Sequence, residues 1–157
     1  MIKTIGEMIN QTKQYFELGM DKLSDLLIEE DVARASMVLA AWVSAADGSI
    51  TESEVSETIK FIKETDFFEE KDHKTLIKEY RKWCEAFIND SEDALLYAFA
   101  EIAPLAHKPE AVNAVLLAYR IAKSDNEISE SELKIITKAC IMLGVKCYGE
   151  SECVLRE

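Results

Sequence analysis

The chain has 157 residues, of which 48% are apolar and 31% charged, and its 18 basic and 30 acidic side chains give a net charge of −12. This length suffices for one domain with its own hydrophobic core, and the apolar content excludes a disordered chain. The negative charge disfavours nucleic acid as a partner, because phosphates repel it, and no apolar stretch is long enough for a transmembrane segment.

Residues 1–29 form the first predicted segment, an amphipathic helix that is either continuous or broken. Alternating steps of four and three residues connect its seam positions, which are Ile5, Ile9, Thr12, Phe16, Gly19, Leu23 and Leu26. A seam with this period is typical of a helix that packs against other helices. The segment is therefore expected to pack over the core, and docking to a partner or a membrane surface is the alternative.

Residues 30–145 are predicted to form an all-α domain, a helical bundle. Proline and glycine, which interrupt helices, number only 2 and 5, and apolar residues recur with the 3.6-residue period of helices. With the N-terminal segment, about seven helices are expected, and the two most apolar ones lie at the centre of the fold. The predicted helices of the domain span residues 31–46, 51–64, 69–88, 91–104, 109–123 and 129–144.

Residues 146–157 are weakly patterned and are expected to form a docked or frayed extension. The cysteines include no C-x-x-C pair, and neither His73 nor His107 stands at metal-ligand spacing from them. Cys84 and Cys140 have partly apolar helical neighbours and are interpreted as buried small hydrophobic residues. Because the N-terminus carries no secretory signal, a reducing cytoplasmic location is expected. The four cysteines are Cys84, Cys140, Cys147 and Cys153.

The chain contains an internal repeat. Residues 38–64 align without gaps on residues 116–142, and 8 of the 27 positions are identical. Five of these identities lie in one short turn, between Asp47 and Glu54, that follows an apolar helix and opens an amphipathic one. Duplication of a helix–acidic turn–helix unit is the simplest explanation, with the two halves related by a pseudo-twofold axis.

The turns have a structural interpretation that involves no ligand. Thr51 and Glu54 fit a capping box, in which the hydroxyl accepts from the N3 amide and the carboxylate accepts from the cap amide. Ser129 and Glu132 fit the same box in the second repeat. The position after each acidic residue holds a type that tolerates the left-handed backbone conformation, Gly48 and Asn126. Helix capping therefore accounts for these positions.

Asp47 and Asp125 are not explained by capping. Each follows the C-terminus of a helix, where the helix dipole disfavours a carboxylate by a few tenths to about 1 kcal/mol. A compensating partner is therefore expected, either a backbone hydrogen bond or a divalent cation. Oxygen ligands of this kind suit Ca²⁺, Mg²⁺ or Mn²⁺. The candidate metal ligands are Asp47, Glu54, Asp125 and Glu132.

An ordinary EF-hand is excluded, although D-G-x-I-T-x-x-E matches the second half of its loop. The first and third ligand positions of such a loop hold Val43 and Ala45 in one copy, and Ile121 and Lys123 in the other. A bound cation would therefore need ligands from both turns. Enzyme motifs are missing too: the sequence has no nucleophile elbow, phosphate-binding glycine loop or H-E-x-x-H, so no enzyme is expected.

The sequence resembles the tellurite-resistance TerB family at Ala46-Asp47-Gly48 and its acidic turn, at Lys108-Pro109-Glu110-Ala111, and at Ala122-Lys123-Ser124-Asp125. This resemblance implies an all-helical domain with a role in the bacterial response to tellurite and other toxic agents. It also implies paired acidic clusters that chelate metal, and assembly with other resistance proteins at the inner face of the membrane. Carried onto this chain, the clusters comprise Asp47 and Glu54, then Asp125 and Glu132. The chain departs from the pattern at Asn126, where the first turn has glycine.

The expected function is that of a non-enzymatic module in a stress-response assembly, with a divalent cation bound through the duplicated turns. The alternative is a structural scaffold for protein interactions, whose acidic turns serve only as helix caps. Expected partners are other resistance or membrane-associated proteins, and a homodimer is left open. The expected location is the cytoplasm, with peripheral attachment to the inner face of the membrane as a second option.

Overall fold

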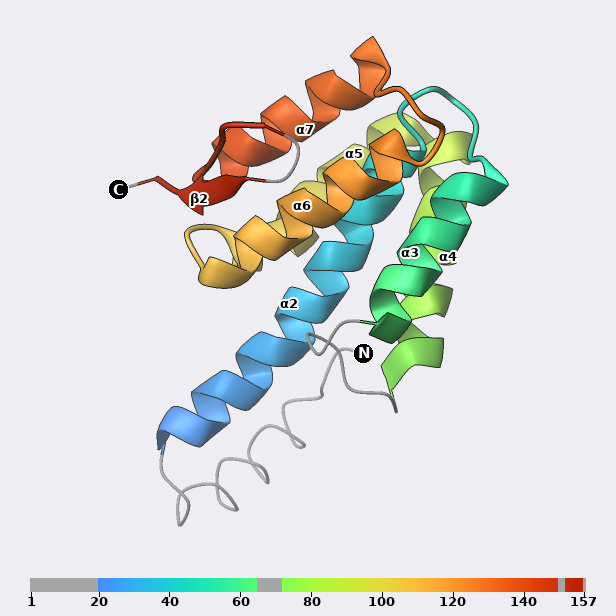
Figure 1. Cartoon of the computed structure of the whole chain (residues 1–157). Helices are drawn as coiled ribbons and strands as arrows, with labels where there is room; N and C mark the ends of the chain where they lie inside the picture. The colour runs from blue at the N-terminus through green and yellow to red at the C-terminus, as the bar shows by residue number, and fades with distance from the viewer. Residues whose placement is uncertain (1–19, 65–71, 150–151, 157) are drawn as a thin grey trace.

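The structure is a computed structural model that describes residues 20–64, 72–149 and 152–156 (Figure 1). These residues form six α-helices, which confirms the predicted all-α fold, together with a 3-10 helix and two short strands. Residues 1–19 of the predicted N-terminal helix lie outside the described residues. The elements are α2 (Met20–Ser44), α3 (Glu52–Glu64), α4 (His73–Asn89), α5 (Ser91–Ile102), η2 (Ala103–Leu105), α6 (Pro109–Lys123), α7 (Glu130–Leu143), β1 (Val145–Cys147) and β2 (Cys153–Leu155).

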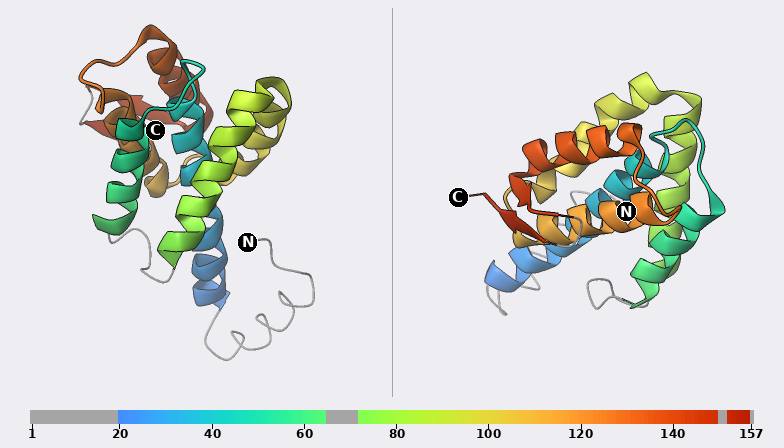
Figure 2. Two further views of the ribbon diagram at one scale, coloured as in Figure 1. Left: turned by 90° about the vertical axis from the view of Figure 1, so that its right-hand side faces the viewer. Right: turned by 45° about the horizontal axis from the view of Figure 1, so that its top comes forward.

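Helix α2 runs through the centre of the bundle, and its first half projects beyond the other helices (Figures 1 and 2). Every residue from Ala35 to Ser44 is buried. Helix α2 packs against α4, α5, α6 and η2. The predicted helix start at residue 31 is wrong, since α2 begins at Met20. The run Glu29-Glu30-Asp31 is charged but contains neither glycine nor proline, so the helix continues through it.

Helix α6 is the second central helix, and it packs against α2, α3 and α7. Each central helix leads through a short turn into an outer helix, α3 after α2 and α7 after α6, as the internal repeat predicted. The two turns lie side by side at the upper right of Figure 1. The repeats also meet along their helices, where Arg120 of α6 forms a 3.1 Å ion pair with Glu57 of α3. The fold therefore brings the duplicated turns to one end of the bundle.

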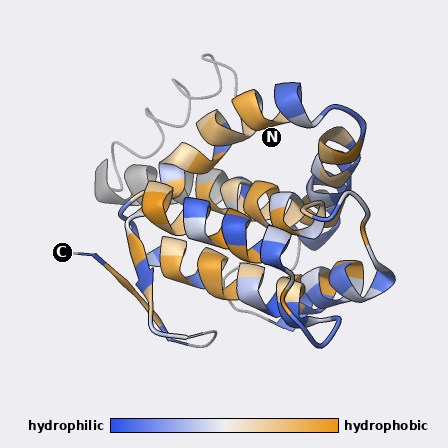
Figure 3. Ribbon diagram, turned by 90° about the horizontal axis from the view of Figure 1, so that it is seen from above, coloured by the Kyte–Doolittle hydropathy of each residue, from blue (hydrophilic) through white to orange (hydrophobic). Residues whose placement is uncertain are grey.

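The outer helices are amphipathic, as Figure 3 shows by the mixture of hydrophobic and hydrophilic residues along their ribbons. The buried residues of α4 follow one another at steps of four, four and three, which places them on one helical face. They are Leu76, Tyr80, Cys84 and Phe87. No helix in the part of the chain that the structure describes is long and apolar enough to cross a membrane.

The chain ends in a small antiparallel hairpin, which the sequence analysis did not predict. Strand β1 pairs with β2, and the directly opposed Cys147 and Cys153 form a disulfide. The hairpin packs on α6 and α7, and Val145 is fully buried there. Three-residue strands are too short to show an alternating sequence pattern, which is why this element escaped detection. Cys84 and Cys140 are free and buried, as predicted.

Candidate functional site

The first acidic turn connects α2 to α3. Gly48 has a φ of +83° and donates its amide to the Ala45 carbonyl at 3.0 Å, so it closes the turn after α2 in the left-handed conformation. The Thr51 amide donates to Glu54 Oε1 at 2.9 Å, and the Glu54 amide donates to Thr51 Oγ1 at 3.2 Å. This is the predicted capping box at the start of α3.

The second turn, between α6 and α7, repeats this geometry. Asn126 has a φ of +82° and donates its amide to the Lys123 carbonyl at 2.9 Å. The Ser129 amide donates to Glu132 Oε1 at 2.9 Å, and the Glu132 amide donates to Ser129 Oγ at 3.1 Å. Both predicted capping boxes are therefore present, and equivalent atoms donate and accept in the two repeats.

The two aspartates join the repeats to each other. The Ser129 hydroxyl donates to Asp47 Oδ1 at 2.9 Å, and the Thr51 hydroxyl lies 3.1 Å from Asp125 Oδ2. The Thr51 hydroxyl also lies 3.0 Å from Glu54 Oε1, so two carboxylates compete for its single hydrogen. We call this reciprocal arrangement the turn clasp. Each aspartate at a helix C-terminus thus has a partner that sequence reasoning missed, the cap hydroxyl of the other repeat.

Buried carboxylates lie beneath the clasp. Glu54 is 3% exposed and Glu132 is 4% exposed. Burial raises the pKa of Glu54 to about 7; hydrogen bonds from Thr51 oppose this rise, and the negative charges of Glu132 and Asp125 add to it. Because the charges of both repeats act on one carboxyl, the structure brings acidic residues of the two turns together, as the pseudo-twofold duplication predicted.

The family model described as Tellurite resistance protein TerB matches residues 33–148. The chain belongs to the TerB family. The match includes both turns of the TerB domain and all of α3, α4, α5, α6 and α7. No curated protein and no solved structure gives a match.

The turns of this TerB domain meet one requirement of a divalent-cation site and leave another unmet. Their donors are carboxylate oxygens, which suit Ca²⁺, Mg²⁺ and Mn²⁺. Within the described ranges, however, no three acidic, histidine or cysteine side chains are arranged as a ready set of metal ligands. Some of the carboxylate oxygens are engaged in the clasp and the capping boxes. The four predicted ligands are Asp47, Glu54, Asp125 and Glu132.

A buried polar network of the TerB domain continues inward from the first turn. Ser44 Oγ lies 2.7 Å from the hydroxyl of Tyr80, and the Thr58 hydroxyl donates to the Glu54 carbonyl at 2.9 Å. Burial raises the pKa of Tyr80 and of the neighbouring Cys84. Both groups stay protonated near neutral pH, so neither provides a base or a thiolate nucleophile. The hydrogen bonds of this network give its buried polar groups partners inside the core.

Proposed function

We propose that this TerB-family protein is a non-enzymatic module in resistance to tellurite and other toxic agents, and that its paired acidic turns bind a divalent cation. The supporting observation is that the turn clasp brings acidic residues of both repeats together. Burial raises the pKa of Glu54 there, and the charges of Glu132 and Asp125 add to the rise. Gathering like charges at a partly desolvated site is unfavourable, and a cation between them would offset the repulsion.

Cation binding would change the turn clasp. Asp47 and Asp125 are exposed, and each accepts a hydrogen bond from a cap hydroxyl of the other repeat. To act as ligands, the aspartates would have to release some of these hydrogen bonds, so the ion competes with the clasp. Ca²⁺ tolerates irregular coordination better than Mg²⁺, which makes it the first ion to test.

Calorimetric titration of the metal-stripped full chain with Ca²⁺, Mg²⁺ and Mn²⁺ tests this proposal. Saturable binding is expected for the native protein, and its loss is expected in an Asp47→Asn, Asp125→Asn double variant. Glu52→Gln with Glu130→Gln is the matched control, because these exposed acidic residues occupy equivalent positions of the two repeats outside the clasp. Absence of binding, or equal loss in the control, would contradict a site at the turns.

The second candidate function is a protein-interaction scaffold whose turns have only a structural role. The reciprocal contacts Ser129–Asp47 and Thr51–Asp125 favour it, because they give each aspartate a hydroxyl partner without an ion. A scaffold would bind no cation, but an Asp47→Ala, Asp125→Ala double variant, which cannot accept the hydroxyl hydrogens, would still lose stability. In both proposals the partners are other resistance or membrane-associated proteins, and the location is the cytoplasm or the inner face of the membrane. Analytical ultracentrifugation would show whether the protein forms a homodimer.

A further inference from the structure

The disulfide hairpin covers part of the C-terminal half of the bundle. Strands β1 and β2 pack on α6, and β1 also packs on α7 (Figure 1). Val145 is fully buried and Cys153 is 8% exposed, so both strands contribute to this contact. We propose that Cys147–Cys153 is a thiol-exchange site, and that its reduction by small thiols such as glutathione releases the hairpin and uncovers the buried thiol of Cys140.

The accessible end of the disulfide is Cys147. This residue is half-buried, whereas Cys153 is buried. The neighbours of Cys147 in the chain, Lys146 and Tyr148, are exposed, and the Lys146 ammonium lies 5.1 Å from the centroid of the Tyr148 ring. An incoming thiolate therefore reaches Cys147 Sγ more easily than Cys153 Sγ.

The exchange proceeds in two steps. A glutathione thiolate attacks Cys147 Sγ, a new S–S bond forms to glutathione, and Cys153 leaves as a thiolate that takes up a proton. A second glutathione thiolate attacks the glutathione sulfur of this mixed disulfide and releases the Cys147 thiolate, which is then protonated. Overall, two glutathione molecules are oxidised to one glutathione disulfide, and one protein disulfide is reduced to two thiols.

Besides the disulfide, the described residues of the hairpin are held by a short strand ladder, by packing of the strands on α6 and α7, and by a few further hydrogen bonds, among them one from Arg156 Nε to the Val145 carbonyl at 3.4 Å. Each strand has three residues, and an isolated two-stranded pair of this kind is marginally stable in water. Outside the strand ladder, the Tyr148 amide donates to the Glu152 carbonyl and the Arg156 amide donates to the Gly144 carbonyl, both at 2.8 Å. Because the disulfide closes the hairpin covalently, its loss increases the population in which β2 leaves α6.

Cys140 reports on this opening. It lies on α7, directly before β1 in the chain, and is 9% exposed. Burial raises the pKa of its thiol, and the nearby Arg156, which follows β2, opposes this rise. The Arg156 amide donates to the carbonyl of Gly144, which ends α7 four residues after Cys140, so the segment after β2 lies against the end of α7 that carries this thiol. Departure of the hairpin therefore changes the surroundings of Cys140. Cys84 on α4 is also buried and free, and it provides an internal control beside Tyr80.

The test begins with the full chain oxidised by glutathione disulfide and then equilibrated in buffers of increasing reduced glutathione. A short pulse of N-ethylmaleimide, followed by acid quenching and peptide mass spectrometry, measures the alkylation of each cysteine. Cys147 and Cys153 are expected to become reactive together, and alkylation of Cys140 is expected to accelerate by about tenfold or more. The alkylation rate of Cys84 is expected to stay unchanged.

A Cys147→Ser, Cys153→Ser variant cannot form the disulfide, and its Cys140 is expected to react rapidly in every buffer. Cys84→Ala is the matched control, and its Cys140 is expected to respond to glutathione as in the native chain. The proposal is overturned if the native disulfide neither forms nor exchanges in these buffers, or if Cys140 remains protected after reduction. It is also overturned if Cys84 reacts in parallel with Cys140, because the chain would then unfold globally.

Discussion

The hydroxyl of Ser129, which caps α7, donates a 2.9 Å hydrogen bond to Asp47, which follows α2 82 residues earlier in the chain. One side chain thereby caps its own helix and binds the turn of the other repeat. The equivalent pair in the other direction, Thr51 and Asp125, lies at 3.1 Å, and there the single hydroxyl hydrogen is shared with Glu54 Oε1 at 3.0 Å. The clasp therefore couples the ends of two central helices to the starts of two outer helices, at the end of the bundle where the repeats meet.

Coupling between Ser129 and Asp47 is measurable by a double-mutant cycle. Ser129→Ala removes both the cap and the clasp bond and is expected to lower the free energy of unfolding by about 1–2 kcal/mol. Asp47→Ala is expected to lower the free energy of unfolding in both backgrounds. Its effect in the Ser129→Ala background is expected to be smaller than in the native chain by about 0.5–1.5 kcal/mol. Urea unfolding measures each value. Ser131→Ala, at an exposed position of the same helix start, is the control, and strictly additive losses would argue against the clasp.

Glu54 gives the stability of the protein a defined pH dependence. Its pKa is about 7 in the folded protein against the ordinary value of 4.5. Between these values the folded state keeps a proton that the unfolded state has lost, so the free energy of unfolding falls as pH rises through this window. Below pH 4.5 both states are protonated, and the advantage of the protonated folded state is fully present.

Glu54→Gln should remove this dependence while keeping the cap, because glutamine can also accept from the Thr51 amide. The variant is expected to be about 1–3 kcal/mol more stable than the native chain at pH 8, and equal to it near pH 4.5. Thermal and urea unfolding across this range provide the measurement. Glu52→Gln, at an exposed position of the same helical turn, should bring no such gain at pH 8. If the free energies of unfolding of Glu54→Gln and the native chain differ by the same amount at pH 4.5 and at pH 8, the assigned pKa is refuted.

The conformation of the turns predicts different tolerances at Gly48 and Asn126. A Cβ on Gly48 would have no atom within 4 Å, so only its φ of +83° opposes a side chain. Gly48→Ala is therefore expected to lower the free energy of unfolding by about 1 kcal/mol, whereas Gly48→Asn is expected to lower it by less. Asn126→Gly should be tolerated within about 0.5 kcal/mol. Urea midpoints distinguish these cases, and a harmless Gly48→Ala would contradict the backbone argument.

The helices and their caps were predictable because they depend on residues close in sequence. Thr51 with Glu54, and Gly48 after α2, carry patterns that span only a few positions. The bonds of Ser129 to Asp47 and Thr51 to Asp125 cross 82 and 74 residues, and their existence depends on how α2 and α6 pack. The repeat suggested that both turns meet, but no local pattern specifies which hydroxyl reaches which carboxylate. The three-residue strands of the hairpin likewise depend on docking to α6 and α7, and so they were missed.

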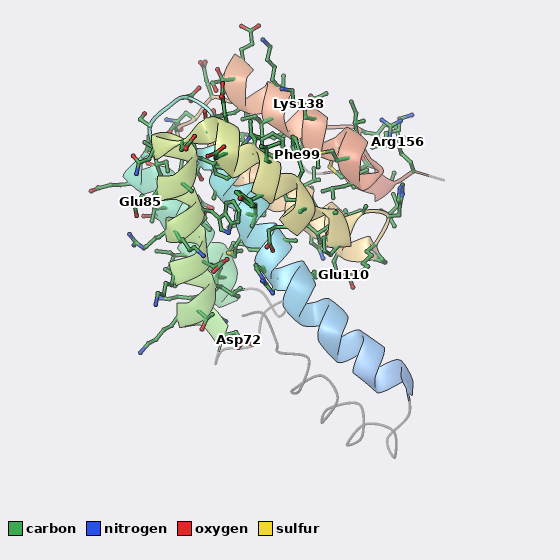
Figure 4. All side chains as sticks on the ribbon, turned by 180° about the vertical axis from the view of Figure 1, so that it is seen from behind. Asp72, Glu85, Phe99, Glu110, Lys138 and Arg156 are labelled. Carbon is green, nitrogen blue, oxygen red and sulfur yellow. A yellow bond between two sulfur atoms is a disulfide. The ribbon has the colours of Figure 1, made fainter. Side chains whose placement is uncertain are left out.

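Gly144 is the least replaceable glycine among those the structure describes. It ends α7 with a φ of +70°, and a Cβ there would collide with the ring of His107, whose amide donates to the Leu143 carbonyl at 2.9 Å. Figure 4 shows α7 from behind, with Lys138 labelled in the middle of the helix and Arg156 labelled near its C-terminal end. Gly144→Ala combines backbone strain with steric overlap and is expected to lower the free energy of unfolding by about 2–4 kcal/mol.

Combining Gly144→Ala with His107→Ala separates the cost of backbone strain from the cost of steric overlap. Removing the ring relieves the overlap but leaves the strained φ, so the double variant should recover part of the loss and remain about 1 kcal/mol below His107→Ala alone. Urea unfolding of the four proteins measures the coupling. Gly48→Ala is the matched control, because Gly48 has a similar φ of +83° and a Cβ there would have no atom within 4 Å. Full recovery in the double variant would mean that backbone conformation contributes nothing at Gly144, and no recovery would mean that His107 is not the obstacle.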